Sequence, residues 1–225
     1  MQNNHLSIIY EDNHLIGVNK LSGQLVQGDK TNDLTLPDYI KEYLKKKFKK
    51  PGNVFCGVIH RLDRPTSGVV LFARTSKALS RLNLQFQNKE PEKTYWAIVE
   101  KNNSPEKQKL VHYLKKNEKK NKSFCVDKNT KGAKKAILNY SVIKHLDKYS
   151  LVEITLETGR HHQIRCQLSK EGMFIKGDVK YGAKRPNANG SICLHARKIS
   201  FKHPTKEEKI CLEASVPKED IWKNI

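Results

Sequence analysis

The chain is poor in cysteine and has no long apolar segment. Its five cysteines are an odd number, and none forms a Cys-x-x-Cys pair, which argues against a disulfide framework and a zinc site. We therefore expect buried free thiols in a reducing cytoplasm. No stretch is long enough to span a bilayer, and the amino-terminal residues Met1–His5 contain no apolar targeting core. These absences predict a soluble, cytoplasmic protein.

Acidic residues are also scarce relative to basic ones. The chain has 23 Asp and Glu residues against 43 Lys and Arg residues, so its formal net charge is +20. Such an excess favours a polyanionic partner, most often nucleic acid, because lysine and arginine neutralise phosphates and release their counterions. A membrane surface is the competing polyanion, but no amphipathic stretch has the aromatic-rich apolar face that membrane binding needs. Nucleic acid is the predicted partner.

Most of this basic charge is lysine, so the few arginines are informative. The planar guanidinium binds carboxylates and phosphates in a bidentate manner that lysine cannot reproduce. The eight arginines are Arg61, Arg64, Arg74, Arg81, Arg160, Arg165, Arg185 and Arg197. Four of them fall within two short segments, residues 60–68 and 156–165. These two segments are the candidate functional sites.

The first segment places a carboxylate, Asp63, between Arg61 and Arg64, and turn-forming residues follow it. The apolar run 69–73 then predicts a buried strand. Flanking cations favour the ionised carboxylate, which suits a nucleophile or general base. An ordinary turn remains the alternative. A protein-kinase catalytic loop is excluded because Leu62 interrupts the His-Arg-Asp signature, no glycine-rich loop precedes it and no Asp-Phe-Gly follows.

The second segment follows a predicted strand and a Thr-Gly turn, and it contains Arg160, His161, His162, Gln163 and Arg165. Adjacent histidines on a regular element point in different directions, and no third ligand is near, so a metal site is disfavoured. A histidine general base, as in a ribonuclease, is a second alternative. In a third, structural interpretation, His162 and Gln163 satisfy buried backbone groups.

Hydrophobic patterns predict more strands than helices. Helices are expected from Thr35, with Ile40, Leu44 and Phe48 on the inner face, and from Ser76. The predicted strands cover residues 7–10, 15–18, 69–73, 93–100, 136–142 and 151–156, and the lysine-rich residues 115–135 read as an exposed hairpin or loop. No regular strand–helix alternation is present, which favours an α+β fold with a mixed or antiparallel sheet. At 225 residues, one domain is the simplest expectation.

Several short motifs, taken in order along the chain, resemble those of one family. They are Asn19-Lys20-Leu21-Ser22-Gly23, His60–Gly68, Lys93-Thr94-Tyr95-Trp96-Ala97, Thr158–Arg165, Gly177-Asp178 with Tyr181-Gly182, and Leu194-His195-Ala196 with Phe201, His203 and Pro204. This ordered set resembles the RluA-type family of RNA pseudouridine synthases. Leu21 departs from the family's proline, and His161 and Gln167 replace its more usual threonine and histidine.

The resemblance implies a pseudouridine-synthase fold, in which helices and loops flank a mixed, mostly antiparallel central sheet with a catalytic cleft. It implies a single catalytic domain over residues 1–225, without a separate amino-terminal RNA-binding domain. The implied activity is that of an isomerase that modifies uridines in ribosomal or transfer RNA stem-loops. The implied enzyme needs no cofactor or metal and is a cytoplasmic monomer.

The resemblance also implies individual roles. Asp63 is the expected catalytic carboxylate, Arg165 its orienting partner and Tyr95 the residue that stacks on the flipped base. Expected RNA contacts are Arg61, Arg64, Arg160 and His162. The alternative function is a non-catalytic RNA-binding or RNA-remodelling protein with the same fold, but the presence of all three expected catalytic residues argues against it.

Overall fold

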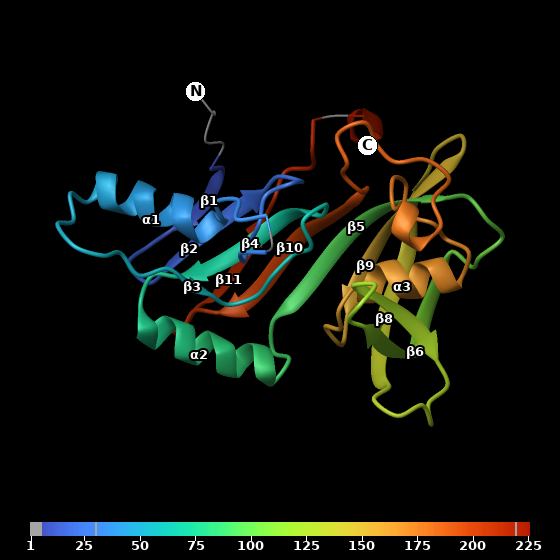
Figure 1. Ribbon diagram of the computed structural model, residues 1–225, viewed down its shortest axis with the longest axis horizontal. Helices are drawn as coiled ribbons and strands as arrows, with labels where there is room; N and C mark the ends of the chain where they lie inside the picture. Colours follow the sequence, from blue (N-terminus) through green and yellow to red (C-terminus); the bar gives the residue numbers. More distant parts are fainter. Residues whose placement is uncertain (1–5, 30, 219) are drawn as a thin grey trace. The chain divides into compact units, whose positions relative to one another are not determined.

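The computed structural model describes residues 6–29, 31–218 and 220–225 (Figure 1). The segment Met1–His5, in which the sequence predicts no targeting core, lies outside these residues. The chain divides into two compact units. The first unit contains residues 1–92 and 196–217, and the second contains residues 93–195 and 218–225. The expectation of one catalytic domain over residues 1–225 stays a prediction.

The first unit is built on a sheet in which β1, β2, β4 and β10 are neighbours in that order. The pairs β1–β2, β2–β4, β3–β4 and β10–β11 are antiparallel. The strands are β1 (Ile8–Glu11), β2 (Leu15–Lys20), β3 (Gly57–Val58), β4 (Ser67–Ala73), β10 (Leu194–Lys202, in this unit from Ala196) and β11 (Lys209–Glu213). The predicted strands at 7–10, 15–18 and 69–73 are confirmed.

Helix α1 (Leu36–Lys47) begins where the sequence predicts. The Thr35 backbone N–H donates to the Asp38 carboxylate at 2.9 Å, and this capping contact satisfies a group left unpaired at the helix start. Ile40 and Leu44 are buried as predicted. Phe48 is wrongly predicted on the inner face: it caps the helix end and is 44% exposed.

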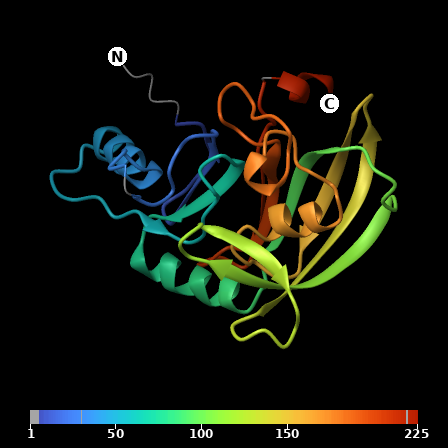
Figure 2. The same ribbon diagram turned by 45° about the vertical axis from the view of Figure 1, so that its right-hand side comes forward.

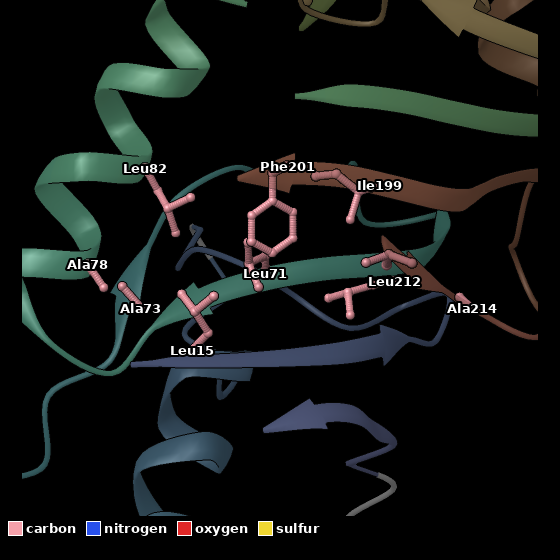
Figure 3. Packing of buried hydrophobic residues seen from close by; sticks show 10 residues of the cluster. Leu15, Leu71, Ala73, Ala78, Leu82, Ile199, Phe201, Leu212 and Ala214 are labelled. Carbon is pink, nitrogen blue, oxygen red and sulfur yellow. The ribbon is translucent and has the colours of Figure 1, made fainter. Parts of the chain in front are cut away.

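Helix α2 (Ser76–Gln87) is also confirmed, although its cap is Thr75 rather than Ser76. The Thr75 hydroxyl accepts the Ala78 N–H at 3.2 Å. Figure 3 shows how the helix supplies Ala78 and Leu82 to the core of the unit. The labelled partners from the strands are Leu15, Leu71, Ala73, Ile199, Phe201, Leu212 and Ala214. Burial of this apolar surface fixes β4, which directly follows the loop that carries Asp63.

The second unit contains a sheet with the strand order β5-β9-β8-β6-β7, in which every neighbouring pair is antiparallel (Figure 2). Its strands are β5 (Glu92–Glu100, in this unit from Lys93), β6 (Lys107–Asn117), β7 (Lys122–Val126), β8 (Lys134–His145) and β9 (Tyr149–Leu156). The lysine-rich residues contribute to the β6–β7 hairpin, which confirms the hairpin interpretation.

Helix α3 (Gln163–Lys170) lies beside β6 and β7 in the second unit (Figure 2). Two short 3-10 helices, η1 (Val179–Tyr181) and η2 (Asp220–Asn224), complete the second unit's secondary structure. The α+β class with a mostly antiparallel arrangement is confirmed. No helix among the described residues is long and apolar enough to cross a membrane.

The five cysteines are free, as predicted. Burial is less complete than expected, because only Cys166 and Cys193 are buried and Cys211 is exposed. Cys125 and Cys166 bring their sulfur atoms to 3.7 Å, so β7 and α3 meet at these two thiols.

Candidate active site

Asp63 lies in a tight loop that leads into β4. The Thr66 N–H donates to the Asp63 backbone carbonyl at 3.0 Å and closes the turn. Gly68, at the start of β4, has a φ of +116°, and a Cβ there would lie 2.7 Å from the carbonyl carbon of Ala196. Only glycine fits this position without displacing backbone. The half-buried Asp63 carboxylate therefore comes from a constrained segment.

Lys20 fixes this loop by hydrogen bonds to its backbone. Its side chain is fully buried at the end of β2, and Nζ donates to the carbonyls of Leu21 at 3.1 Å, Arg64 at 3.0 Å and Thr66 at 2.6 Å. Burial lowers the pKa of Lys20 to about 7, the charge of Asp63 opposes that shift and Arg64 adds to it. Two of the three bonds fix the backbone directly after Asp63, at Arg64 and Thr66.

Arg61 and Arg64, the predicted RNA contacts of this loop, are exposed. Arg61 Nη1 donates to the Gln27 side-chain oxygen at 2.6 Å. Arg64 Nη2 lies 2.7 Å from an Asp33 carboxylate oxygen, and Nη1 lies 3.6 Å from Asp29. Exposed ion pairs contribute about 1 kcal/mol or less, so an RNA phosphate can replace these carboxylates at little cost.

Tyr95 lies on β5 of the second unit, opposite Ile154 of β9, and its side chain is half-buried. The predicted strand and its regular pairing are therefore confirmed at this residue. A tyrosine that keeps part of its ring exposed offers a flat surface for a base. Its role in catalysis stays a prediction.

Arg165, on α3, makes a buried two-point contact with Asp178. Nε lies 2.7 Å from Oδ2 and Nη2 lies 2.8 Å from Oδ1, while the two residues are 5% and 1% exposed. Nη1 lies 3.1 Å from the Nε2 atom of His162. The guanidinium also lies over the Tyr181 ring, 5.0 Å from its centroid. These contacts fix both the position and the plane of the guanidinium.

His162 is buried, and both of its ring nitrogens have protein partners. Nδ1 lies 2.9 Å from the Tyr181 hydroxyl, and Nε2 faces Arg165. These contacts position α3 and do not support direct RNA contact. The His161 ring stacks on it with centroids 3.8 Å apart, so the expectation that the two rings point in different directions is wrong. His162 has a φ of 52°, which breaks the regular geometry on which that expectation depended.

Gln163 plays the structural part proposed for it. Its side-chain oxygen accepts the Arg160 N–H at 2.9 Å and the Thr158 hydroxyl at 2.8 Å, and its amide donates to the Ile137 carbonyl at 3.0 Å. Arg160 is exposed, and its Nε donates to the Lys135 carbonyl at 3.0 Å. The Thr-Gly turn is thus fastened to β8 while Arg160 stays at the surface.

Gln167, one of the departures from the family pattern, is fully buried. Its amide lies 3.3 Å from the carbonyls of Leu110 and Ala136 and 3.1 Å from His112 Nδ1. This departure therefore changes the interior contacts of α3 with β6 and β8. Within the described residues, no group of His, Cys, Asp and Glu side chains could hold a metal ion.

Several residues that support the site have contacts that the sequence motifs do not predict. Lys20, Asp178 and Tyr181 lie in motifs that were recognised, but the motifs did not reveal what these side chains contact. Ser123, on β7, lay outside any motif: its N–H donates to the Tyr181 hydroxyl at 2.8 Å and its hydroxyl donates to the His161 carbonyl at 2.7 Å. Their acceptors and donors are distant in the sequence, so only the fold reveals them.

Comparisons with known proteins identify the family of this chain. Residues 14–170 match the family model described as RNA pseudouridylate synthase. The chain is 31% identical over 225 residues to ribosomal large subunit pseudouridine synthase D of Zymomonas mobilis, covering 95% of this chain and 70% of that protein. It is 32% identical over 236 residues to tRNA pseudouridine synthase C of Haemophilus ducreyi, covering 93% and 90%.

Among solved structures, the fold resembles human RNA pseudouridylate synthase domain containing 4. The TM-score is 0.77 at 24% sequence identity, over 94% of this chain and 89% of that one. The family model and the named relatives together define an RNA-modifying isomerase. The chain belongs to the RNA pseudouridylate synthase family.

Proposed function

We propose that this enzyme converts uridines in structured ribosomal or transfer RNA to pseudouridine, with Asp63 as the catalytic carboxylate. The observation that carries the assignment of Asp63 is the constraint on its loop: Lys20 bonds to the carbonyls of Arg64 and Thr66, which directly follow Asp63, and Gly68 packs against Ala196. A catalytic group benefits from such preorganisation. Relatives named for ribosomal and for transfer RNA support both substrate classes.

The reaction breaks the N1–C1′ bond of uridine, rotates the uracil and joins C5 to C1′. The C5 hydrogen leaves as a proton, N1 ends with a proton, and no net oxidation occurs. The target base is stacked in RNA and must first be flipped out, which costs a few kcal/mol. Contacts between a basic surface and the RNA backbone offset this cost.

Three roles for Asp63 remain open: attack on C1′, addition to the uracil ring, or abstraction of a sugar proton that leads to a glycal. Each role uses an ionised carboxylate. We assign Arg165 as the group that orients it and Tyr95 as the residue that stacks on the flipped base. The contacts of Arg165 with Asp178 support this assignment, because they hold the guanidinium in one orientation.

Arg61, Arg64 and Arg160 are proposed to contact the RNA backbone. All three are exposed, and their present partners are exposed polar groups or a backbone carbonyl. The lysine-rich turn of the β6–β7 hairpin is proposed as a further RNA contact within the second unit. We propose that the enzyme acts as a monomer in the cytoplasm.

The test is release of tritium from RNA labelled at C5 of uridine. Ribosomal and transfer RNA transcripts are assayed separately, with wild type, Asp63→Asn and a matched carboxylate-to-amide control at an exposed turn, Asp127→Asn. Wild type and the control should release tritium, and Asp63→Asn should not. Release that persists in Asp63→Asn contradicts the role of Asp63, and no release from either RNA class contradicts the proposed substrates.

A further inference from the structure

A second candidate site lies in the second unit, in a cavity of about 490 Å³ whose lining includes none of the residues assigned above to catalysis or RNA contact. Four cationic side chains line it, Lys148, Lys176, Lys184 and Arg185, together with one carboxylate, that of Glu100. Glu100 lies five residues beyond Tyr95 on β5, a separation of about 16 Å along the strand.

The charges of this cavity favour an anion. Lys148, Lys184 and Arg185 are exposed, and among the described residues none of the three forms an ion pair with a carboxylate. A concave, low-dielectric wall concentrates the field of such cations. Arg185 adds a planar fork that matches two oxygens of a phosphate. A phosphate group is therefore the ligand group that these three cations would bind.

The same cavity has an aromatic surface. Tyr149, the first residue of β9, is half-buried and is one of the residues that line the cavity. Every nucleobase has a face that stacks on an aromatic ring, and such stacking is insensitive to sequence. Cations beside an exposed aromatic ring are the combination that binds a nucleotide of a single strand.

The cavity is preformed by a rigid loop. The Lys176 backbone bonds to Ile98 O and Cys193 N, both at 2.9 Å, while its Nζ donates to the buried Asn187 side chain at 2.8 Å. Gly177 has a φ of +87°, and a Cβ there would lie 2.6 Å from Asn187 Nδ2. The loop therefore packs too closely to accept another residue at this position, and it holds the lining in place.

We propose that this cavity binds one nucleotide of the substrate RNA strand, with its phosphate held by Lys184 and Arg185 and its base against Tyr149. This inference rests on the proposed RNA substrate. It adds an RNA contact at the opposite end of β5 from Tyr95. The cavity thereby helps to select RNA that extends beyond the flipped nucleotide. A free nucleoside monophosphate offers the same chemistry, and the experiment separates the two sources.

The first measurement compares RNA affinity, by fluorescence anisotropy, for wild type and the double variant Lys184→Gln/Arg185→Gln between about 50 and 200 mM salt. Each phosphate contact that is lost flattens the slope of log K against log salt by about 0.7 for single-stranded RNA. The control, Lys198→Gln/Lys202→Gln, makes the same charge change at two exposed positions of β10. Only the first variant should flatten the slope.

The second measurement tests stacking at the same cavity. Tyr149→Phe keeps the aromatic face and should bind RNA as wild type does. Tyr149→Ala removes it and should bind roughly 5- to 100-fold more weakly. Circular dichroism of both variants checks that β9 remains folded, and equal affinity of folded Phe and Ala variants contradicts the stacking contact.

Equal salt slopes for the two double variants overturn the proposal. Saturable binding of uridine monophosphate that Lys184→Gln/Arg185→Gln abolishes, with no change in the RNA slope, identifies a free-nucleotide site and also overturns it. Failure of the proposed function is a separate result. It is seen as no tritium release from wild type, whether or not the double variant changes the RNA slope.

Discussion

Arg165 and Asp178 form a buried, two-point ion pair within the second unit, at 2.7 and 2.8 Å. Arg165, the proposed orienting partner of Asp63, is thus itself held by a carboxylate thirteen residues later in the chain. Two elements meet at the pair: α3 carries Arg165, and η1, which begins directly after Asp178, carries Tyr181 against the guanidinium. If Arg165 orients Asp63 as proposed, Asp178 acts through Arg165 as a positioning residue.

Asp178→Asn should lower kcat more than it weakens RNA binding. The amide keeps the shape of the side chain but removes the charge that satisfies Arg165, and a buried ion pair that loses one partner destabilises a protein by about 3–5 kcal/mol. Tritium release and RNA affinity are measured at a temperature where circular dichroism shows the variant folded. Asp127→Asn, at an exposed turn, is the control. A loss of activity that appears only together with unfolding contradicts the positioning role.

The stability of the Asp63 loop should depend on pH through Lys20. Burial lowers the pKa of Lys20 from 10.5 to about 7 in the folded chain, so between these values the unfolded chain binds more protons. Stability contributed at this site therefore rises as the pH rises. The free energy of unfolding of wild type, relative to Lys20→Met, should increase by about 2 kcal/mol between about pH 7 and pH 9.

Urea unfolding at the two pH values measures this difference, with Lys77→Met on the exposed side of α2 as control. The control should show no such pH dependence. Three carbonyl acceptors match the three N–H groups of an ammonium, and they oppose proton loss. If the difference in free energy of unfolding between wild type and Lys20→Met does not change with pH, these carbonyls and Asp63 keep Lys20 charged. That result contradicts the prediction.

The local elements of the fold were predictable because their signals lie within a few residues. The Thr35–Asp38 capping contact, the apolar run of β4 and the alternation in β5 each depend on neighbours in the sequence. Phe48 was misplaced because periodicity continued past the residue where the helix ends. Its ring centroid instead lies 4.8 Å from the guanidinium carbon of Arg74, the residue that follows β4, and helical spacing cannot show such a contact.

The candidate site was predictable only in part. Asp63, Tyr95 and Arg165 came from motifs, whereas α3 was not predicted as a helix. Its buried positions include the polar residues Gln163, Arg165 and Gln167, so it lacks the apolar stripe that identifies a surface helix. Their partners lie on β6, β8 and near η1. A lysine at the end of a strand likewise suggests an exposed side chain. The three carbonyls that accept hydrogen bonds from the buried Lys20 cannot be recognised in the sequence.

Gly68→Ala should destabilise the enzyme more than Gly132→Ala does. Both glycines have a positive φ, +116° and +83°, but a Cβ at Gly132 meets nothing within 4 Å, whereas one at Gly68 meets the backbone of Ala196. The conformational penalty alone is about 1 kcal/mol, and overpacking adds about 1–3 kcal/mol at Gly68. Urea unfolding of both variants gives the comparison. Equal losses of free energy of unfolding in the two variants would show that β4 and β10 move apart at little cost to accept the extra methyl group.

Arg160 and His162 should separate RNA binding from structural support, although both come from the same motif. Arg160→Gln removes an exposed cation and should flatten the salt dependence of RNA binding by about 0.7–1, with little change in stability. His162→Asn retains a residue that tolerates the positive φ but removes the ring that contacts Tyr181 and Arg165. It should lower the free energy of unfolding by about 1–3 kcal/mol and leave the salt slope unchanged. If folded His162→Asn flattens the salt dependence of RNA binding, His162 contacts RNA directly. That result contradicts the structural role inferred from its burial.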